Sequence, residues 1–416
     1  MHPYSDCSAS PKRGREDLDS AITTLNEALR LEPKNYAVAV NLARTLRERG
    51  HLDEAITWFE RAVELEPRAA DGFSMLSNAR REAGHIDAAI DAARRALDVN
   101  PRHVEAHLNH GAALQAADVP DDACTSYLVA QLLSPRDPRV RNNLSSLLKS
   151  ASATSHVATW IRRLQANPAD TAANDALIAR ELDEARSASA LVLLEHRIAR
   201  KAEPSPLRKL ALLLWERGSR SEATEYLRRA LELDPKDVKS LRLLGSWYSG
   251  LGDGEAAEGY LRQVLTLTPE DVVSKINLGA TLIRQGRPVE ATRVLTEAVA
   301  TWPDRIEGLI NLGTALSDQG RFSEARAIYQ RGLRIRPAQK DLDLEPALLD
   351  ALRSDRHTGR PVRSAHRARQ SHRAGDHAVR PLAIEARGSS PSPPHRARIA
   401  RFPRTPRRLP ARTLLA

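Results

Sequence analysis

Apolar residues recur along most of this chain at the three- and four-residue spacing of an amphipathic helix. Short polar breaks divide them into runs, and residues 272–305 contain one pair. The first run ends at Gln285-Gly286-Arg287 and the second at Trp302-Pro303. Because proline lacks an N–H and disfavours helix at the residue before it, the pattern predicts two helices joined by a tight turn. The apolar positions of this pair are Ile276, Leu278, Leu282, Ile283, Val289, Val294, Leu295 and Ala298.

The same pair of helices repeats with a period of 34 residues. Prolines mark the period in two series, Pro33, Pro67, Pro101 and Pro135, then Pro235, Pro269, Pro303 and Pro337. Alanine lies twelve residues before each of them, at Ala21, Ala55, Ala89, Ala123, Ala223, Ala257, Ala291 and Ala325. A fixed period of this length predicts a solenoid of stacked units, none of which buries its apolar face alone.

Further positions agree in register with the prolines. The turn residue is glycine at 50, 84, 218, 252, 286 and 320, and Asp118 replaces it in one unit. Leucine lies 25 residues before the proline in six units, at 42, 76, 210, 244, 278 and 312, next to a small residue. This arrangement over residues 18–337 resembles the tetratricopeptide repeat family. The resemblance implies an all-α, right-handed superhelical solenoid of about nine helix-turn-helix repeats, whose first helices line a concave groove.

The register slips in the middle of the chain and is incomplete at its ends. Pro135 and Pro235 are two residues short of three periods apart, so we interpret residues 138–170 and 171–203 as degenerate units. A linker without repeats is the alternative. At the start, residues 1–17 are expected to be disordered, and 18–31 provide only a second helix. The solenoid is expected to span residues 18–352, with a short closing helix at 346–352.

The composition changes after residue 352. The formal charge of the chain is +10, but residues 353–416 contain 16 Arg and 3 acidic residues, which leaves about −3 for the rest. This segment has no apolar periodicity, and we expect it to be disordered. Three interpretations stay open: a solvated extension, a basic arm that binds nucleic acid or an anionic surface, and a segment that is not the native continuation of the chain.

Little in the sequence favours catalysis. His103, His107 and His110 could converge on one helix face as zinc ligands, but the last two occupy packing positions, so core histidines are the favoured interpretation. Gly250 to Gly254 is similar to a phosphate loop but lies at the turn of its own unit. No catalytic motif, metal site or cofactor is predicted. The two cysteines and the lack of an 18-residue apolar run favour a cytoplasmic protein with no membrane span.

The polar residues of the first helices are the best candidates for binding. Asparagine occupies one repeat position in five units, at Asn41, Asn109, Asn143, Asn277 and Asn311. An amide has donors and an acceptor, so such a row could hold a peptide backbone. The Asn-Leu-Gly triplets at 277–279 and 311–313 are similar to those in the superhelix of O-linked N-acetylglucosamine transferases. The alternative is that these amides only join neighbouring helices. Arg44, Arg47, Asn78 and Arg81 suggest a basic stretch for an acidic peptide.

We therefore predict a non-enzymatic scaffold that binds a protein or peptide partner, an acidic segment being one candidate. Two other hypotheses are retained. The chain could be the repeat part of a larger glycosyltransferase or sulfotransferase, or it could associate with nucleic acid through its arginine-rich tail. The pattern does not specify an oligomeric state.

Overall fold

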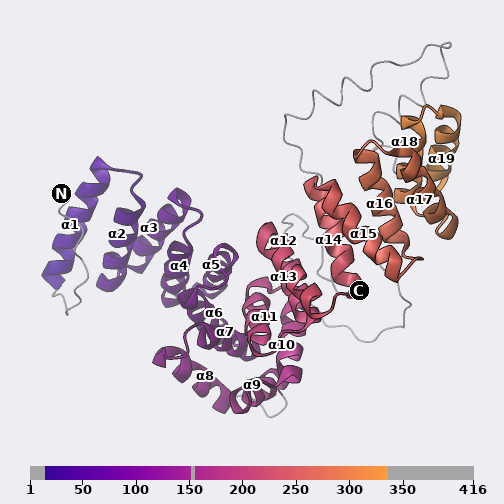
Figure 1. The fold of residues 1–416 in the computed structure, drawn as a ribbon. Coiled ribbons are helices and arrows are strands. Elements are labelled where there is room, and N and C mark those ends of the chain that lie inside the picture. The colour runs from indigo at the N-terminus through magenta and orange to yellow at the C-terminus, as the bar shows by residue number, and fades with distance from the viewer. Residues whose placement is uncertain (1–14, 151–154, 336–416) are drawn as a thin grey trace. The chain divides into compact units, whose positions relative to one another are not determined.

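The computed structural model describes residues 15–150 and 155–335, and every element of regular structure in these ranges is an α-helix (Figure 1). The predicted tail at 353–416, the closing helix at 346–352 and most of the N-terminal segment 1–17 lie outside the described residues. The chain divides into two compact units, with the boundary between residues 202 and 203. We call them the first unit and the second unit, and the predicted degenerate repeats end at the boundary between them.

The first unit contains eleven helices among the described residues. They are α1 (Arg15–Leu31), α2 (Tyr36–Arg49), α3 (Leu52–Leu65), α4 (Ala70–Glu82), α5 (Ile86–Val99), α6 (Val104–Ala116), α7 (Pro120–Leu133), α8 (Pro138–Ser150), α9 (His156–Ala166), α10 (Thr171–Asp183) and α11 (Ser187–Arg200).

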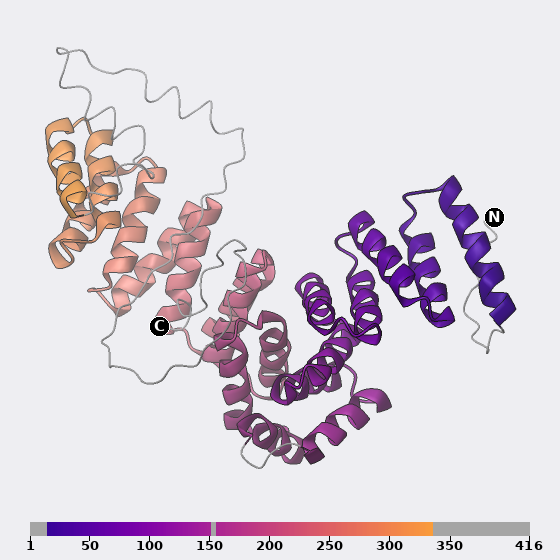
Figure 2. The ribbon, with the colours of Figure 1, turned by 180° about the vertical axis from the view of Figure 1, so that it is seen from behind.

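The second unit contains eight helices in its described part. They are α12 (Pro204–Glu216), α13 (Arg220–Leu233), α14 (Val238–Leu251), α15 (Gly254–Leu267), α16 (Val272–Arg284), α17 (Pro288–Thr301), α18 (Ile306–Asp318) and α19 (Phe322–Ile335). Helix α1 and the nine helix pairs that follow it confirm the predicted all-α repeat architecture. Even-numbered helices are the first helix of each pair, and the view from behind shows the pairs in succession (Figure 2).

The tight turns follow from backbone chemistry. All six predicted turn glycines have positive φ, between 75° and 93°, a conformation that costs glycine little. Asp118, the predicted replacement, has φ 57°. Ala185 also has φ 57°, at the turn of the degenerate unit 171–203, which contains no glycine. The turn geometry is therefore retained even where the glycine is not.

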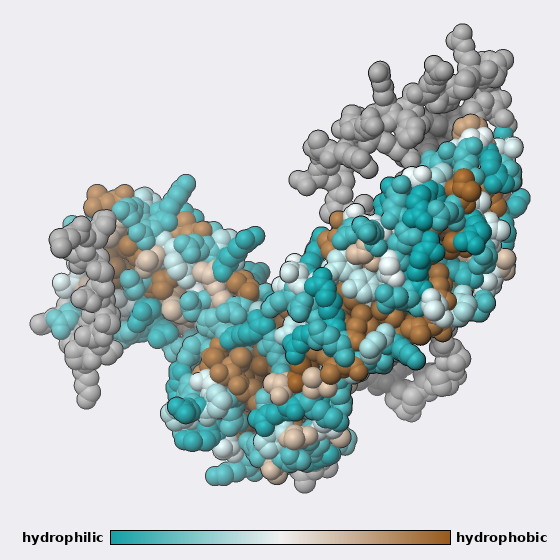
Figure 3. All heavy atoms as spheres, in the orientation of Figure 1, coloured by the Kyte–Doolittle hydropathy of each residue, from teal (hydrophilic) through white to brown (hydrophobic). Residues whose placement is uncertain are grey.

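Small residues let the two helices of a pair approach each other. The repeat alanines Ala55, Ala89, Ala123, Ala223, Ala257 and Ala291 are fully buried. A Cβ atom added to Gly111 would lie 2.7 Å from the ring of Tyr127, and one added to Gly245 would lie 2.7 Å from Leu261. A bulky side chain of the second helix thus occupies the space that the small residue leaves. The visible surface is mostly hydrophilic, with apolar residues in separate patches (Figure 3).

First helices also pack on first helices within each unit. Helix α4 packs on α6 in the first unit, and α16 packs on both α14 and α18 in the second. In the described residues, the second helices α13, α15 and α17 show no comparable packing on one another. First helices α14, α16 and α18 therefore form a continuous row in the second unit, and α4 and α6 pack in the same way in the first. We call the surface of the first helices in each unit the A-helix face.

The degenerate repeats depart from simple stacking. Helices α8 and α9 both pack on α7, and α11 also packs on α7 although three helices separate them in the chain. Residues 123–130 of α7 are consequently all buried. Arg102, in the turn before α6, reaches α11 as well, with its Nε 3.1 Å from Glu195 Oε1. A solenoid in which each unit contacts only its neighbours does not describe this part of the first unit.

Candidate peptide-binding surface

The predicted site residues are all on first helices, but they fall in both compact units. Asn41 and Arg44 lie on α2, Asn78 and Arg81 on α4, Asn109 on α6 and Asn143 on α8. Asn277 lies on α16 and Asn311 on α18. The residues are therefore considered as two separate groups.

In the first unit, α2 and α4 carry a group with incompletely paired charge. Arg44 is exposed and makes no hydrogen bond or ion pair with any described residue. Arg81 donates to Asn78 Oδ1 at 2.9 Å, and Asn78 Nδ2 donates to Glu82 Oε1 at 3.0 Å. Glu82 also lies 3.7 Å from Arg47. One carboxylate is thus shared by neighbouring cations, and the guanidinium of Arg44 stays available.

Asn109 joins helices inside the protein. Its Nδ2 donates to the carbonyl oxygen of Ser74 at 2.9 Å and lies 3.0 Å from Ser74 Oγ. Ser74 is on α4, one repeat earlier, so this amide links two first helices. Asn143 contacts Tyr127, whose pKa burial raises to about 12 while Arg81 and the hydrogen bond to Asn143 act in the opposite direction. These two amides have partners within the protein, as the alternative interpretation of the asparagines expects.

In the second unit, the side chains of Asn277 and Asn311 lack the kind of hydrogen bond that Asn109 makes in the first. Both are partly exposed, and neither side-chain amide makes a hydrogen bond with another described residue. Ile276 beside Asn277 is buried, and Ile310 beside Asn311 is partly exposed. An amide that is fixed by its helix and lacks a protein partner has its donors and acceptor free for a ligand.

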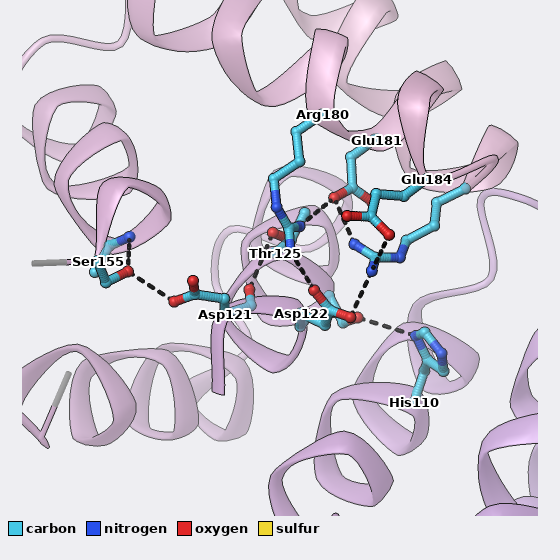
Figure 4. A network of polar contacts seen from close by, with 11 residues as sticks. His110, Asp121, Asp122, Thr125, Ser155, Arg180, Glu181 and Glu184 are labelled. Atoms are coloured by element: carbon cyan, nitrogen blue, oxygen red, sulfur yellow. Dashed lines mark hydrogen bonds and ion pairs between the residues drawn. The ribbon is translucent and has the colours of Figure 1, made fainter. Parts of the chain in front are cut away.

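The sequence did not reveal a buried ionic network that joins α10 and α11 to α7 (Figure 4). Asp122 on α7 contacts both Arg180 and Arg186, and its Oδ2 is 2.5 Å from the Arg186 guanidinium. Glu181, which is 1% exposed, accepts from Arg180 at 2.9 Å and from Arg186 at 3.2 Å. Burial raises the pKa of Glu181, and the two arginines oppose that shift. Buried charges require partners, and the network supplies them for Glu181 while it connects α10 and α11 to α7.

The three histidines have separate partners. His103 Nε2 lies 2.7 Å from Asp71, His107 Nε2 lies 2.8 Å from the carbonyl oxygen of Pro101, and His110 Nδ1 lies 3.0 Å from Ser126 Oγ. Burial lowers the pKa of His107 to about 4 and that of His110 to about 3. Residues 15–150 and 155–335 contain no group of His, Cys, Asp or Glu that could hold a metal ion. None of α1–α19 is long and apolar enough to cross a membrane.

Paired helices, a 34-residue period and positive-φ turns define the class as a helical repeat protein. Three sequence models described as tetratricopeptide repeat match the chain, one at residues 13–78, one at 74–138 and 208–272, and one at 271–338. Together they cover more than half of it, and the chain belongs to the tetratricopeptide repeat family. The models leave out 139–207, which contains the two degenerate units.

Solved structures with similar folds include MamA and the yeast protein Tom70. A MamA structure is 19% identical and covers 42% of this chain and 98% of its own, with a TM-score of 0.38. MamA from Desulfovibrio magneticus RS-1 is 18% identical and covers 41% of this chain and 97% of its own, with a TM-score of 0.39. Tom70 is 15% identical and covers 76% of this chain and 79% of its own, with a TM-score of 0.35. No curated protein sequence matches the chain.

Proposed function

We propose that this protein is a non-catalytic scaffold that binds peptide segments of partner proteins along its A-helix face. The observation that carries the proposal is the state of the amides on α16 and α18. Asn277 and Asn311 lie one repeat apart on adjacent first helices, partly exposed and without a described partner. The similarity of their Asn-Leu-Gly triplets to those of O-linked N-acetylglucosamine transferases supports a ladder of amides that holds a peptide backbone.

The group on α2 and α4 supports an acidic partner. Arg44 has no described partner, and Arg47 and Arg81 share Glu82. A guanidinium presents a fork of donors that fits a carboxylate. A peptide with acidic residues would therefore bind this group better than a neutral peptide of the same length.

The test begins with a displayed library of random peptides selected on the full chain. Selected peptides are then labelled and measured by fluorescence anisotropy against variants of the same chain. Each amide hydrogen bond is worth about 1 kcal/mol, so replacing both Asn277 and Asn311 by Ala should weaken binding roughly tenfold to thirtyfold. Replacing both Arg44 and Arg81 by Ala should weaken acidic peptides more than neutral ones.

A matched control removes charge from second helices. Arg94 on α5 and Arg293 on α17 are exposed, and replacing both by Ala should leave peptide affinity unchanged.

Unchanged affinity in the Asn277→Ala, Asn311→Ala double variant would reject the amide ladder. Loss of folding in that variant, seen by circular dichroism, would instead show that the two amides stabilise the stack.

A further inference from the structure

A chain of hydrogen bonds crosses from α16 to α14 in the second unit. Arg284 donates to Ser249 Oγ, Ser249 Oγ lies 2.9 Å from Thr281 Oγ1, and Thr281 donates to the carbonyl oxygen of Asn277 at 2.8 Å. The proton of Thr281 is used by that carbonyl, so Ser249 is the donor to Thr281. Both hydroxyl groups are buried. Because Ser249 donates its proton to Thr281, its oxygen accepts from Arg284 and holds one N–H of the guanidinium in place.

Arg284 has no acidic partner among the described residues, unlike other arginines at the first helices of the second unit. Arg208 pairs with Asp237, Arg242 with Asp271 at 2.9 Å, and Arg305 with Glu307 at 3.3 Å. Partial burial lowers the pKa of Arg284, and no nearby carboxylate opposes the shift. A guanidinium has five N–H donors. Arg284 is therefore a positioned cation with most of its donors unused.

Asn277, Thr281 and Arg284 are four and then three residues apart on α16, so they lie on one face of that helix. The rise of a helix places Asn277 and Arg284 about 10 Å apart along its axis. An extended peptide covers that distance in about three residues. A peptide whose backbone is held at Asn277 and that runs along α16 would thus bring a side chain to Arg284 a few residues further on. The contact with Asn311 would then be made by the part of the peptide on the other side of Asn277.

We propose that Arg284 binds the carboxylate of an aspartate or glutamate in the peptide that Asn277 holds, which rests on the proposed function above. The guanidinium would bind both oxygens, with Ser249 keeping its plane in position. A carboxylate fits better than a phosphate because a single uncompensated cation balances one negative charge. The second unit would then select for an acidic residue at a fixed distance from the backbone contact at Asn277.

The test compares three pools of labelled nine-residue peptides that differ only at the central position, which is Glu, Gln or phosphoserine. Anisotropy titrations use the full chain, its Arg284→Ala variant and an Arg293→Ala control that removes the same charge from the surface of α17. We expect the wild-type chain to bind the Glu pool about tenfold more tightly than the Gln pool. Arg284→Ala should reduce this ratio severalfold, and Arg293→Ala should leave it unchanged.

A second variant examines position rather than charge. Ser249→Ala keeps the guanidinium but removes the hydroxyl that orients it, so the preference for Glu should fall part of the way. A Glu preference that Arg284→Ala leaves intact would overturn the site at Arg284. If the phosphoserine pool bound best and lost its advantage in Arg284→Ala, the group bound by Arg284 would be a phosphate, and the carboxylate proposal would be wrong.

The pools also separate this inference from the function on which it rests. Binding of the Gln pool, with no gain for Glu, would overturn the carboxylate site and leave the scaffold function in place. Failure of every pool to bind, the Gln pool included, would contradict both.

Discussion

Backbone conformation at a single residue, Ala185, gives a direct test of the turn geometry. Its φ of 57° lies in the left-handed region, where a residue with a Cβ atom pays roughly 1–2 kcal/mol that glycine does not. Ala185→Gly should therefore stabilise the first unit, by about 0.5–1 kcal/mol after the greater chain entropy of glycine is subtracted. Urea unfolding followed by circular dichroism measures the difference.

The control for Ala185→Gly is the same substitution in ordinary helical backbone. Ala327 is exposed in the interior of α19, and Ala327→Gly should destabilise by roughly 0.5–1 kcal/mol. If both substitutions destabilised the protein, the turn would not hold residue 185 at positive φ.

The lowered pKa of His110 leads us to expect that the protein becomes less stable as pH falls. Burial lowers its pKa to about 3 in the folded protein, with smaller contributions from His107, Arg94 and Arg186, against an ordinary 6.5. Between these values only the unfolded chain binds the proton, so stability is lost as pH falls below 6.5. At pH 5 the loss from this one residue is about 2 kcal/mol.

Replacing His110 by Leu removes the titrating group and restores the residue found at this repeat position in other units, such as Leu312. Denaturation midpoints at pH 7.5 and pH 5 should therefore differ less in His110→Leu than in the wild type. His107 and the carboxylates titrate in both proteins, and the comparison cancels them. The same pH dependence in both proteins would mean that His110 takes up its proton equally well in the folded and the unfolded protein.

The sequence was informative at single residues where volume or φ is constrained. The buried alanines and the six turn glycines follow from the 34-residue period because close helix packing favours a small side chain and positive φ favours glycine in each unit, although Asp118 and Ala185 also adopt the turn conformation. Whether each asparagine amide has a hydrogen-bond partner within the protein could not be predicted in this way. Asn109 and Asn277 occupy the same repeat position, but only Asn109 meets a serine on the preceding first helix, and that depends on packing between units.

Helix α11 is the element whose position depends on the ionic network. Arg186 is placed just before it and contacts both Asp122 and Glu181. Removing one member of a buried ion pair costs about 3 kcal/mol or more when the remaining charge has no other partner. When Arg186 is replaced, Arg180 still contacts both Asp122 and Glu181. Arg186→Gln should therefore destabilise the first unit by a smaller amount, about 1–2 kcal/mol, and hydrogen exchange should accelerate in α10 and α11.

The double variant Glu181→Gln, Arg186→Gln provides the control for this prediction. It removes the cation and the buried anion together, so it should be less destabilised than Arg186→Gln alone. A double variant at least as unstable as the sum of both single changes would show that the two side chains do not act as a pair.

The helices themselves could be predicted, but the packing of α11 could not. A helical period places apolar residues on one stripe, and Leu191, Leu194 and Ile198 of α11 show such a stripe. The structure buries residues 188–194 on all sides. Serine and alanine at these positions gave no sign of a second contact, because small residues are compatible with both exposed and buried surfaces. Asp122 is 58 residues from Arg180 and 64 from Arg186 in the sequence, so no local pattern could reveal their contacts.

At the scale of the whole molecule, charge is distributed unevenly along the sequence. Residues 353–416 carry 16 Arg and 3 acidic residues, whereas the remaining residues are slightly acidic overall. Binding to a polyanion depends on the number of cations that neutralise it and weakens as salt rises. Salt-dependent binding to a polyanion can therefore distinguish an association with nucleic acid through residues 353–416 from the proposed scaffold function of the repeats.

Retention on heparin should therefore depend on residues 353–416. We expect the full chain to be retained and to elute with increasing salt, and a chain ending at residue 352 to pass through. A chain in which residues 353–416 are kept in composition but scrambled in order should be retained like the wild type, because this attraction does not read sequence. If the chain ending at 352 were retained equally well, the cations responsible would lie in the repeats. Arg44 would then be the first residue to replace, because it is exposed and makes no contact with a described acidic residue.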